Sequence, residues 1–460
     1  MSETNLSASV RPGQSIELDI HGLGSSGEGV GRYQGLTIFV PGGVPGDTLE
    51  VRIGEVKQNY ARGQLVGIVT PSPDRVVPPC PVVGECGGCQ LQHIDYAAQL
   101  RLKRQQVVDA LERLGKLKDV TVHPTKGMDE PWHYRNKAQF PVGTRSGKVI
   151  AGFFAPGTHR IVDIAGCDIQ HPLGNGVMQA VKALVQRHGV SIYDERTHRG
   201  VLRHVLARVG RGTGEAMAVL VTNGPELPHG KEIARALMAQ VPAVVSVVQN
   251  INSQRTNVVL GRESRVLAGR GEIIDHIGAL EFAISPVSFF QVNPVQTEVL
   301  YGQALAYAGL TGAETVLDLY CGIGTISLFL AKQARAVIGI EVVPEAIEDA
   351  LVNARRNGVE NVRYVCGDAT AEMPKLAAEG TKADVIVVDP PRKGCDPPVL
   401  EAMAAMTPER IVYVSCNPAS LARDLGLLAG LGYRTLEVQP VDMFPHTAHV
   451  ECVAWLARDK

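Results

Sequence analysis

Alternating hydrophobic and polar residues dominate the first 70 positions of the chain. Residues 16–20 and 50–53 alternate strictly, and residues 37–40 form a short apolar run. Glycine-rich stretches separate these segments, and several prolines follow between positions 71 and 81. Short strands at this spacing, with turn residues between them, are typical of a small β-barrel. We therefore predict an N-terminal barrel that ends in a proline-rich linker.

The hydrophobic period changes at position 96. Apolar residues recur at helical spacing as far as position 114, with Arg101, Lys103 and Arg104 between them. The pattern predicts a long amphipathic helix with a basic face. Such a face is either an RNA contact or an ordinary solvated surface, and the sequence leaves both interpretations open.

Strand and helix patterns share the middle of the chain, residues 120–288. Its strand-prone segments include residues 204–209, 216–221 and 244–248. Helical spacing predicts two helices, near residues 173–188 and 230–240. The mixture is typical of an α+β domain.

From about residue 290 to the end, strand and helix patterns alternate regularly. The predicted strands are residues 315–319, 336–340, 362–365, 384–388, 411–414 and 434–438. The predicted helices are residues 294–308, 325–333, 344–357, 397–405 and 418–429. This alternation predicts a parallel, doubly wound sheet of the Rossmann type. We therefore expect a multidomain α/β protein with domains at 8–70, 71–288 and 289–460, in which helix 95–115 can pack on the last domain.

The composition is that of an ordinary globular protein. No apolar run reaches the length of a membrane span, and the N-terminus lacks the basic-then-apolar pattern of a secretory signal. Nine cysteines are an odd count, which favours a reducing cytoplasm over a disulfide framework. The formal net charge of −2 neither favours nor excludes nucleic acid, because a local basic face is what binds RNA. The sequence indicates no obligate protein partner.

A strand that runs into a glycine turn marks a cofactor site near residue 320. The buried segment 316–319 precedes Gly322 and Gly324, whose missing side chains let the backbone approach a ligand closely. Glu341 follows 19 residues after Gly322, at the distance of a carboxylate that binds ribose hydroxyls. Asp368 ends the next strand. A nicotinamide cofactor would fit the same turn, although Ser327 stands where the last small residue of that fingerprint belongs, which favours S-adenosylmethionine.

Two later strand ends carry the reactive groups. Asp389 is followed by two prolines, which stiffen the loop and hold the carboxylate over the site. Cys416 ends the fifth strand, and a thiolate there suits addition to carbon 6 of uracil, which makes carbon 5 nucleophilic. Removing the carbon 5 proton then needs a general base, for which Glu451 is the candidate. Without this context, a buried cysteine and an exposed glutamate would be the simpler interpretations.

Four further cysteines have the spacing of a metal or cluster site. Cys80, Cys86 and Cys89 are separated by five and two residues, and Cys167 stands far downstream. Four thiolates bind either zinc or an iron–sulfur cluster, and the spacing alone does not distinguish them.

Several motifs resemble those of one enzyme family. They are residues 134–137 (YRNK), 288–293 (SFFQVN), 389–394 (DPPRKG), 413–418 (YVSCNP) and 444–451 (FPHTAHVE). Together they resemble the RNA uracil-5 methyltransferase family over nearly the whole chain. Residues 13–70 also resemble the TRAM domain, an RNA-binding β-barrel.

This resemblance implies a role for individual residues. It makes Cys416 the nucleophile and Glu451 the base. It places a further set of side chains around S-adenosylmethionine or the uracil: Gln291, Tyr320, Glu341 and Asp389, with Thr325 and Asp368 as additional members. Gln291 would steady the enolate, because an amide donates to developing negative charge.

The resemblance also implies an RNA substrate and a cluster. The ribosomal branch of the family has this cysteine pattern and carries a [4Fe–4S] cluster, so 23S ribosomal RNA is the expected substrate. The transfer-RNA branch, which typically lacks the barrel and the cysteines, is the first alternative. An amino-group methyltransferase would use Asp389 without needing Cys416, and a non-catalytic RNA-binding cluster protein would need neither.

A uracil in structured RNA must be extruded to reach Cys416. The predicted RNA contacts are the barrel, the basic helix, and two groups of cations and aromatics. These groups are Tyr134, Arg135 and Lys137, and the run Arg196, Arg199, Arg203, Arg208 and Arg211. Each is equally compatible with an ordinary solvated surface.

Overall fold

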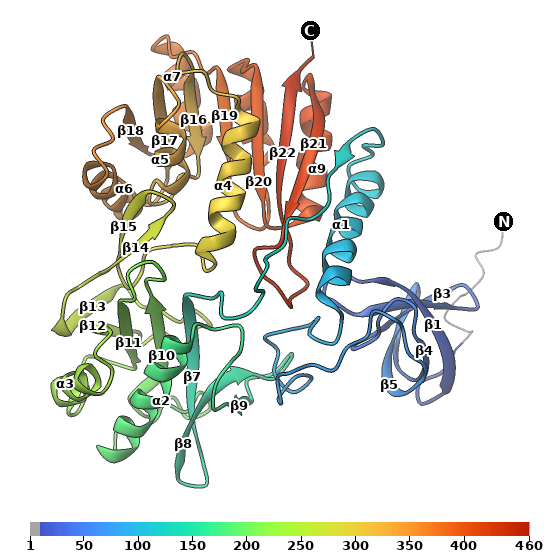
Figure 1. Ribbon diagram of the computed structural model, residues 1–460, viewed down its shortest axis with the longest axis vertical. Helices are drawn as coiled ribbons and strands as arrows, with labels where there is room; N and C mark the ends of the chain where they lie inside the picture. The colour runs from blue at the N-terminus through green and yellow to red at the C-terminus, as the bar shows by residue number, and fades with distance from the viewer. Residues whose placement is uncertain (1–9, 460) are drawn as a thin grey trace.

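The computed structural model describes residues 10–459, which form a barrel followed by two larger sheets (Figure 1). The barrel strands are β1 (Ser15–Leu23), β2 (Gly29–Tyr33), β3 (Leu36–Val40), β4 (Thr48–Val56) and β5 (Tyr60–Thr70). They close in the order β1-β2-β3-β5-β4. The alternation seen at residues 16–20 places Ile16, Leu18 and Ile20 inside, each at most 6% exposed. The predicted N-terminal barrel is confirmed.

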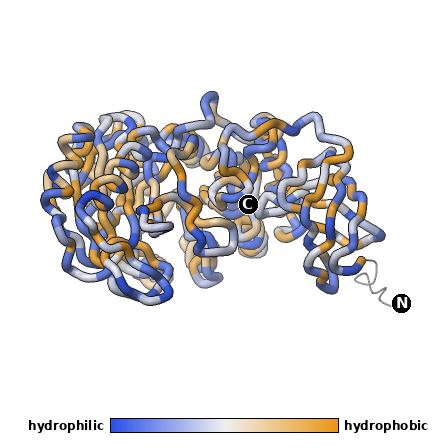
Figure 2. The backbone as a smooth tube through the Cα atoms, turned by 90° about the horizontal axis from the view of Figure 1, so that it is seen from below, coloured by the Kyte–Doolittle hydropathy of each residue, from blue (hydrophilic) through white to orange (hydrophobic). Residues whose placement is uncertain are grey.

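The middle part of the chain forms a mixed seven-stranded sheet, which lies below the C-terminal sheet in Figure 1. Its strands are β7 (Lys137–Arg145), β8 (Lys148–Phe154), β9 (Ile161–Asp163), β10 (Leu202–Val209), β11 (Ala216–Thr222), β12 (Val244–Ile251) and β13 (Glu263–Gly269). Helices α2 (Pro172–Arg187) and α3 (Gly230–Gln240) pack on each other and on this sheet through one apolar core. Figure 2 shows hydrophobic stretches running through the interior of the molecule, with mostly hydrophilic loops at its margins.

The C-terminal sheet has eight strands in the order β18-β17-β16-β19-β20-β22-β21-β6. They are β6 (Thr121–Val122), β16 (Thr315–Leu319), β17 (Ala336–Glu341), β18 (Val362–Cys366), β19 (Val385–Val388), β20 (Arg410–Ser415), β21 (Tyr433–Val441) and β22 (Glu451–Arg458). Its helices are α4 (Pro294–Ala308), α5 (Thr325–Ala331), α6 (Pro344–Arg356), α7 (Ala369–Ala378), α8 (Pro397–Ala405) and α9 (Pro418–Gly430). A hairpin of β14 (Ile273–Ile277) and β15 (Leu280–Ile284) precedes α4.

The predicted doubly wound fold is confirmed, with two corrections. The sheet is not wholly parallel, because β22 runs antiparallel to both β20 and β21. Helix α7 was not predicted, since it is short and contains Pro374, which breaks the helical pattern of the sequence. None of the helices within residues 10–459 is both long and apolar enough to cross a membrane.

Helix α1 (Tyr96–Arg113) joins the barrel to the C-terminal sheet. It packs against α9 and also contacts β1 of the barrel. After it, β6 adds to the edge of the C-terminal sheet by pairing with β21. The segment after the barrel therefore packs on the C-terminal sheet before the chain enters the central one.

The predicted basic face of α1 is partly wrong. Lys103 is completely buried and donates a hydrogen bond of 2.5 Å to Asp442, which follows β21. The same ammonium group donates to the backbone oxygen of Phe444, and Tyr96 donates its hydroxyl to Asp442. Lys103 shares a helix stripe with Val107 and Leu111, so its position at a buried spacing was visible in the sequence.

Replacing Lys103 tests how much this buried pair contributes. The variant Lys103→Met leaves the charge of Asp442 buried without its cation and with only the Tyr96 hydroxyl as a side-chain donor, which costs about 3–5 kcal/mol of folding free energy. The matched control is Arg101→Met, which breaks the exposed pair with Asp74 and costs less than about 1 kcal/mol. Urea unfolding of both variants measures the difference, and equal midpoints would contradict the assignment.

Candidate active site

Strand pairing brings Cys416 and Glu451 together. Ser415, the last residue of β20, pairs with Cys452 of β22. Cys416 directly follows Ser415 and Glu451 directly precedes Cys452, and the charge of Glu451 raises the pKa of the Cys416 thiol. The two side chains predicted as nucleophile and base are therefore neighbours.

Burial and charge perturb both groups. Burial raises the pKa of Glu451 to about 8, with Asp389 adding to the shift and Arg392 opposing it. Burial raises the pKa of the Cys416 thiol to about 11, the carboxylates of Glu451 and Asp389 add to this, and Arg392 again opposes. Arg392 therefore lowers the pKa of both groups and makes their ionised forms more accessible.

Asp389 completes this group of acids at the carboxyl end of β19. Burial raises the pKa of Asp389 to about 6. Asp389 in turn disfavours the charge of both Glu451 and Cys416, so three acidic groups with raised pKa values share one site. Perturbed acids gathered in this way are typical of catalytic sites.

Cys416 lines a cavity of about 480 Å³ between the C-terminal sheet, helix α1 and the barrel. Arg392 and His449 form one wall, and Arg392 donates to His449 at 3.3 Å. Burial and the neighbouring Arg392 lower the pKa of His449 to about 4, so the neutral ring can accept this bond. Sequence analysis gave neither residue a role, although both lie in motifs of the resemblance.

The glycine turn after β16 leads into the predicted cofactor site. Glu341 ends β17 and accepts hydrogen bonds from the backbone of Gly322 at 3.2 Å and Val343 at 2.9 Å. Gly324 adopts a φ of +80°, and a Cβ there would collide with the Tyr364 hydroxyl. The turn therefore requires glycine.

The other predicted cofactor residues lie at the same edge of the sheet. Tyr320 follows β16 directly, with a φ of +63°. Asp368 is exposed and caps α7 by accepting from the backbone of Thr370 at 2.8 Å. Ser327, which departs from the dinucleotide fingerprint, donates to the buried carboxylate of Asp318 at 2.5 Å. This hydrogen bond explains why a serine is found at position 327, where the dinucleotide fingerprint has glycine or alanine.

Tyr301 was missed by sequence analysis and links two predicted residues. Its hydroxyl lies 3.2 Å from the hydroxyl of Thr325. Burial and Asp389 raise the pKa of Tyr301, whereas the side chains of Thr325 and Gln291 lower it. Asn136 of the central domain donates to the backbone oxygen of Gln291 at 3.1 Å. Gln291 is thus held where the central and C-terminal domains meet.

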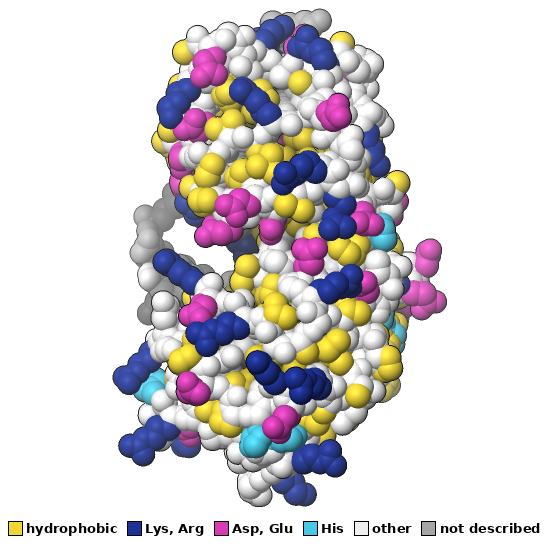
Figure 3. All heavy atoms as spheres, turned by 90° about the vertical axis from the view of Figure 1, so that its left-hand side faces the viewer, with side chains coloured by type: hydrophobic (Ala, Val, Ile, Leu, Met, Phe, Trp, Pro, Cys, Tyr) yellow, Lys and Arg dark blue, Asp and Glu magenta, His cyan; other side chains and the backbone are white. Residues whose placement is uncertain are grey.

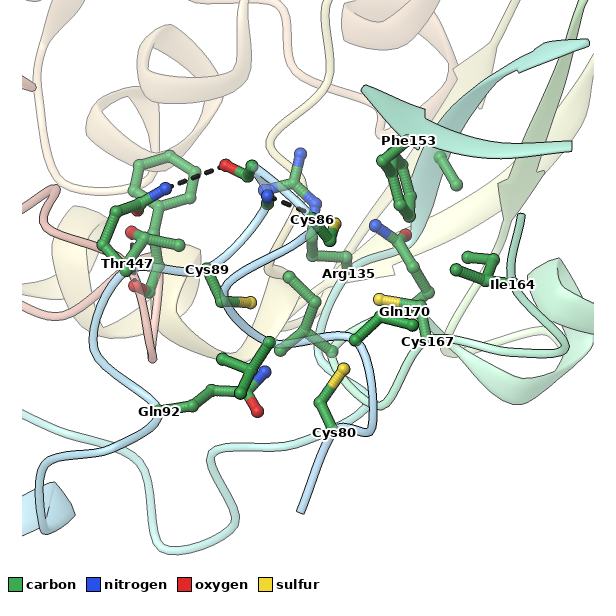
Figure 4. A pocket seen from close by; sticks show the side chains of 18 of the residues that line it. Cys80, Cys86, Cys89, Gln92, Arg135, Phe153, Ile164, Cys167, Gln170 and Thr447 are labelled. Carbon is green, nitrogen blue, oxygen red and sulfur yellow. Dashed lines mark hydrogen bonds between the residues drawn. The ribbon is translucent and has the colours of Figure 1, made fainter. Parts of the chain in front are cut away.

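The four predicted metal ligands surround a second cavity, of about 470 Å³ (Figure 4). Cys80, Cys86, Cys89 and Cys167 line it together with Arg135, and Arg392 and His449 separate it from the Cys416 cavity. The side chain of Asn175 fixes Cys167 through two hydrogen bonds of 3.1 Å with its backbone.

These four sulfurs suit a group that takes thiolate ligands. A zinc ion and a four-iron cluster both accept four cysteines. The arrangement of the cysteines around one cavity is therefore compatible with either group.

Several predicted RNA contacts are buried and serve the fold. Arg203 donates to the backbone oxygens of Asn252 and Gln254, and Arg208 donates to those of Pro286 and Ser288. Both arginines are at most 5% exposed.

Tyr134 is buried as well, and its hydroxyl donates to the backbone of Pro445. Arg196, Arg199 and Arg211 remain exposed. On the face drawn in Figure 3, basic side chains are spread among acidic ones rather than gathered in one patch.

Comparisons with known proteins agree with this geometry. A family model described as tRNA (Uracil-5-)-methyltransferase matches residues 280–459, and a TRAM domain model matches residues 9–66. A protein of Halalkalibacterium halodurans described as an uncharacterized RNA methyltransferase is 55% identical, over 98% of each chain. A protein of Clostridium tetani with the same description is 53% identical, over 96% of each chain.

A solved structure extends the likeness to the whole architecture. It is the Pyrococcus abyssi tRNA (uracil-54, C5)-methyltransferase in complex with S-adenosyl-L-homocysteine, with a TM-score of 0.76 and 28% identity. The match covers 96% of this chain and 100% of that one. The sheet and the barrel together define an S-adenosylmethionine-dependent RNA methyltransferase. More narrowly, the chain belongs to the RNA uracil-5-methyltransferase family.

Proposed function

We propose that this protein methylates carbon 5 of a uracil in RNA through a transient covalent bond to Cys416. The observation that carries the proposal is the pairing of Ser415 with Cys452, which supports a thiol at position 416 close to the buried carboxylate of Glu451. A nucleophile and a base on the same side of a sheet can act on adjacent atoms of one ring.

Cys416, Glu451 and Arg392 have separate roles in the proposed reaction. Cys416 sulfur forms a bond to carbon 6, and the ring electrons move to oxygen 4. S-adenosylmethionine supplies an electrophilic methyl group to carbon 5 when bound. Glu451 then removes the proton from carbon 5, the ring double bond re-forms, and Cys416 leaves as thiolate. Arg392 favours the ionised states of both side chains.

We further propose that the methyl donor lies across the glycine turn at the carboxyl edge of the sheet. Glu341 would accept from ribose hydroxyls and Asp368 from the adenine amino group. Gly322 and Tyr320 would border the donor, and Asp389 would lie between it and the uracil. Thr325 and Gln291 would close the site from the side of Tyr301.

The covalent step is tested with a pair of variants. In Glu451→Gln the amide cannot remove the carbon 5 proton, so we expect a methylated RNA–protein adduct that survives a denaturing gel. Cys416→Ser should form no adduct and lose at least about 10³-fold in methylation rate. Its affinity for S-adenosylmethionine should stay within about twofold. Normal turnover by Cys416→Ser would refute the mechanism.

For the substrate, we propose a uridine of 23S ribosomal RNA. The support is the cysteine pattern of residues 80–167, which resembles that of the ribosomal branch. Transfer RNA is the second candidate, favoured by the Pyrococcus abyssi tRNA enzyme. Because that match covers 96% of this chain, the barrel does not by itself separate the two substrates.

Mapping 5-methyluridine in a strain that lacks the gene distinguishes these substrates. We expect loss of a methyl group from 23S ribosomal RNA and restoration by a plasmid copy. Complementation with the Cys416→Ser variant serves as the control. Loss from transfer RNA alone would overturn the ribosomal assignment and leave the chemistry intact.

We also propose that Cys80, Cys86, Cys89 and Cys167 hold a [4Fe–4S] cluster with a structural role. The placement of all four cysteines around one cavity of about 470 Å³, and the resemblance of their spacing to that of the ribosomal branch, support it. Anaerobic purification should give a brown protein with about four irons per chain. Cys86→Ser should lose iron, whereas the buried, distant Cys395→Ser should retain it. A colourless protein containing zinc would refute the cluster.

A further inference from the structure

We propose that His188, His229 and Glu232 form a binding site for a divalent transition-metal ion on the central domain. His188 caps the C-terminal end of α2, His229 precedes α3, and Glu232 lies in the first turn of α3. The site is independent of the cysteines and of the proposed reaction. Figure 1 shows α2 and α3 at the lower end of the molecule, away from the ends of β20 and β22.

The three side chains already converge as ligands do. His229 Nδ1 lies 3.0 Å and His188 Nδ1 lies 3.9 Å from the same oxygen of Glu232. All three donor atoms are within 4.8 Å of one another. Zinc bonds of about 2.0–2.2 Å to nitrogen and oxygen place tetrahedral ligands roughly 3.4 Å apart. Small side-chain rotations would therefore admit an ion.

The orientation of the His229 ring adds a second observation. His229 has a φ of +58°, a left-handed conformation that histidine adopts more often than most residues do and that His133 and His198 share. It stands at the N-cap of α3, yet its side chain makes no capping hydrogen bond. The ring turns instead toward Glu232 and the ring of His188, with ring centroids 5.2 Å apart. Capping of α3 therefore does not explain this conformation.

The surroundings suit a cation with one open position. His188 lies at the negative end of the α2 dipole, which favours positive charge there. The side chain of His188 is 22% exposed and that of Glu232 is 63% exposed, so solvent reaches one side of the site. Water can supply the fourth ligand.

Ligand chemistry limits the metal to borderline ions. Two imidazoles and one carboxylate suit Zn²⁺, Ni²⁺ or Cu²⁺, whereas Mg²⁺ and Ca²⁺ prefer oxygen ligands. We commit to Zn²⁺. Bound there, the ion would tie the end of α2 to the start of α3, two helices that share one apolar core with the central sheet.

Calorimetric titration of the anaerobically purified protein with Zn²⁺ tests the site. The wild-type protein should bind one Zn²⁺ that His229→Ala and His188→Ala bind at least about 10-fold more weakly. The matched control is His159→Ala, which removes a histidine whose Nδ1 also pairs with a glutamate, at 2.5 Å from Glu195, but without a second imidazole. This control should bind Zn²⁺ like the wild type.

Cobalt identifies the ligands directly. In the visible and near-ultraviolet absorption spectrum, Co²⁺ in the proposed site should give only weak d–d bands. A sulfur-to-cobalt charge-transfer band should be missing, because no thiolate is a ligand. Unchanged Zn²⁺ affinity in His229→Ala, or a strong charge-transfer band that survives in that variant, would overturn the proposal. Unchanged methyl-donor affinity in each variant shows that the protein remains folded.

Discussion

The active site depends on how the loop between β21 and β22 is anchored. Asp442 at its start is neutralised by Lys103 of α1, in a pair with no exposed surface. Farther along the loop, the backbone oxygen of His446 accepts from Gln90 and Leu91, next to the cysteines. Helix α1 and the cysteine segment therefore hold the loop that delivers Glu451 to its place. A buried charge pair of this kind adds specificity more than stability, because each partner is costly alone.

A second constraint is the mutual repulsion of the acids that the anchored loop assembles. Asp389 disfavours the charge of Glu451, both carboxylates disfavour that of Cys416, and Arg392 opposes these effects from an exposed position. Burying these acidic groups lowers the folding stability, and the surrounding apolar cores must compensate for this loss. If an RNA phosphate or base displaced Arg392, the pKa of the Cys416 thiol and that of the Glu451 carboxyl would both rise.

Strong periodicity made the C-terminal domain predictable. Helix α4 and strand β16 match their predicted bounds, because long apolar patterns dominate there. The antiparallel direction of β22 was not predictable, since strand direction depends on packing partners that a linear pattern does not contain. Cys416 and Glu451 followed from chemistry at strand ends. The contacts of Tyr301 and Lys103 could not be predicted, because both involve residues more than 20 positions away. Only the buried spacing of Lys103 was visible in the sequence.

The pairing of β20 with β22 has a further consequence for how this enzyme can change. Successive side chains of a strand point to opposite faces, so a slip of one residue would turn Glu451 away from Cys416. Insertions or deletions of an odd number of residues within either strand should therefore abolish activity even where the sheet still forms. The loop between β21 and β22 is not a strand, so a one-residue change there does not reverse the direction of its side chains. Its contacts with α1 and with the cysteine segment limit its length instead. Insertions and deletions among relatives should therefore occur outside β20 and β22. A relative in which both strands keep these lengths is expected to be active.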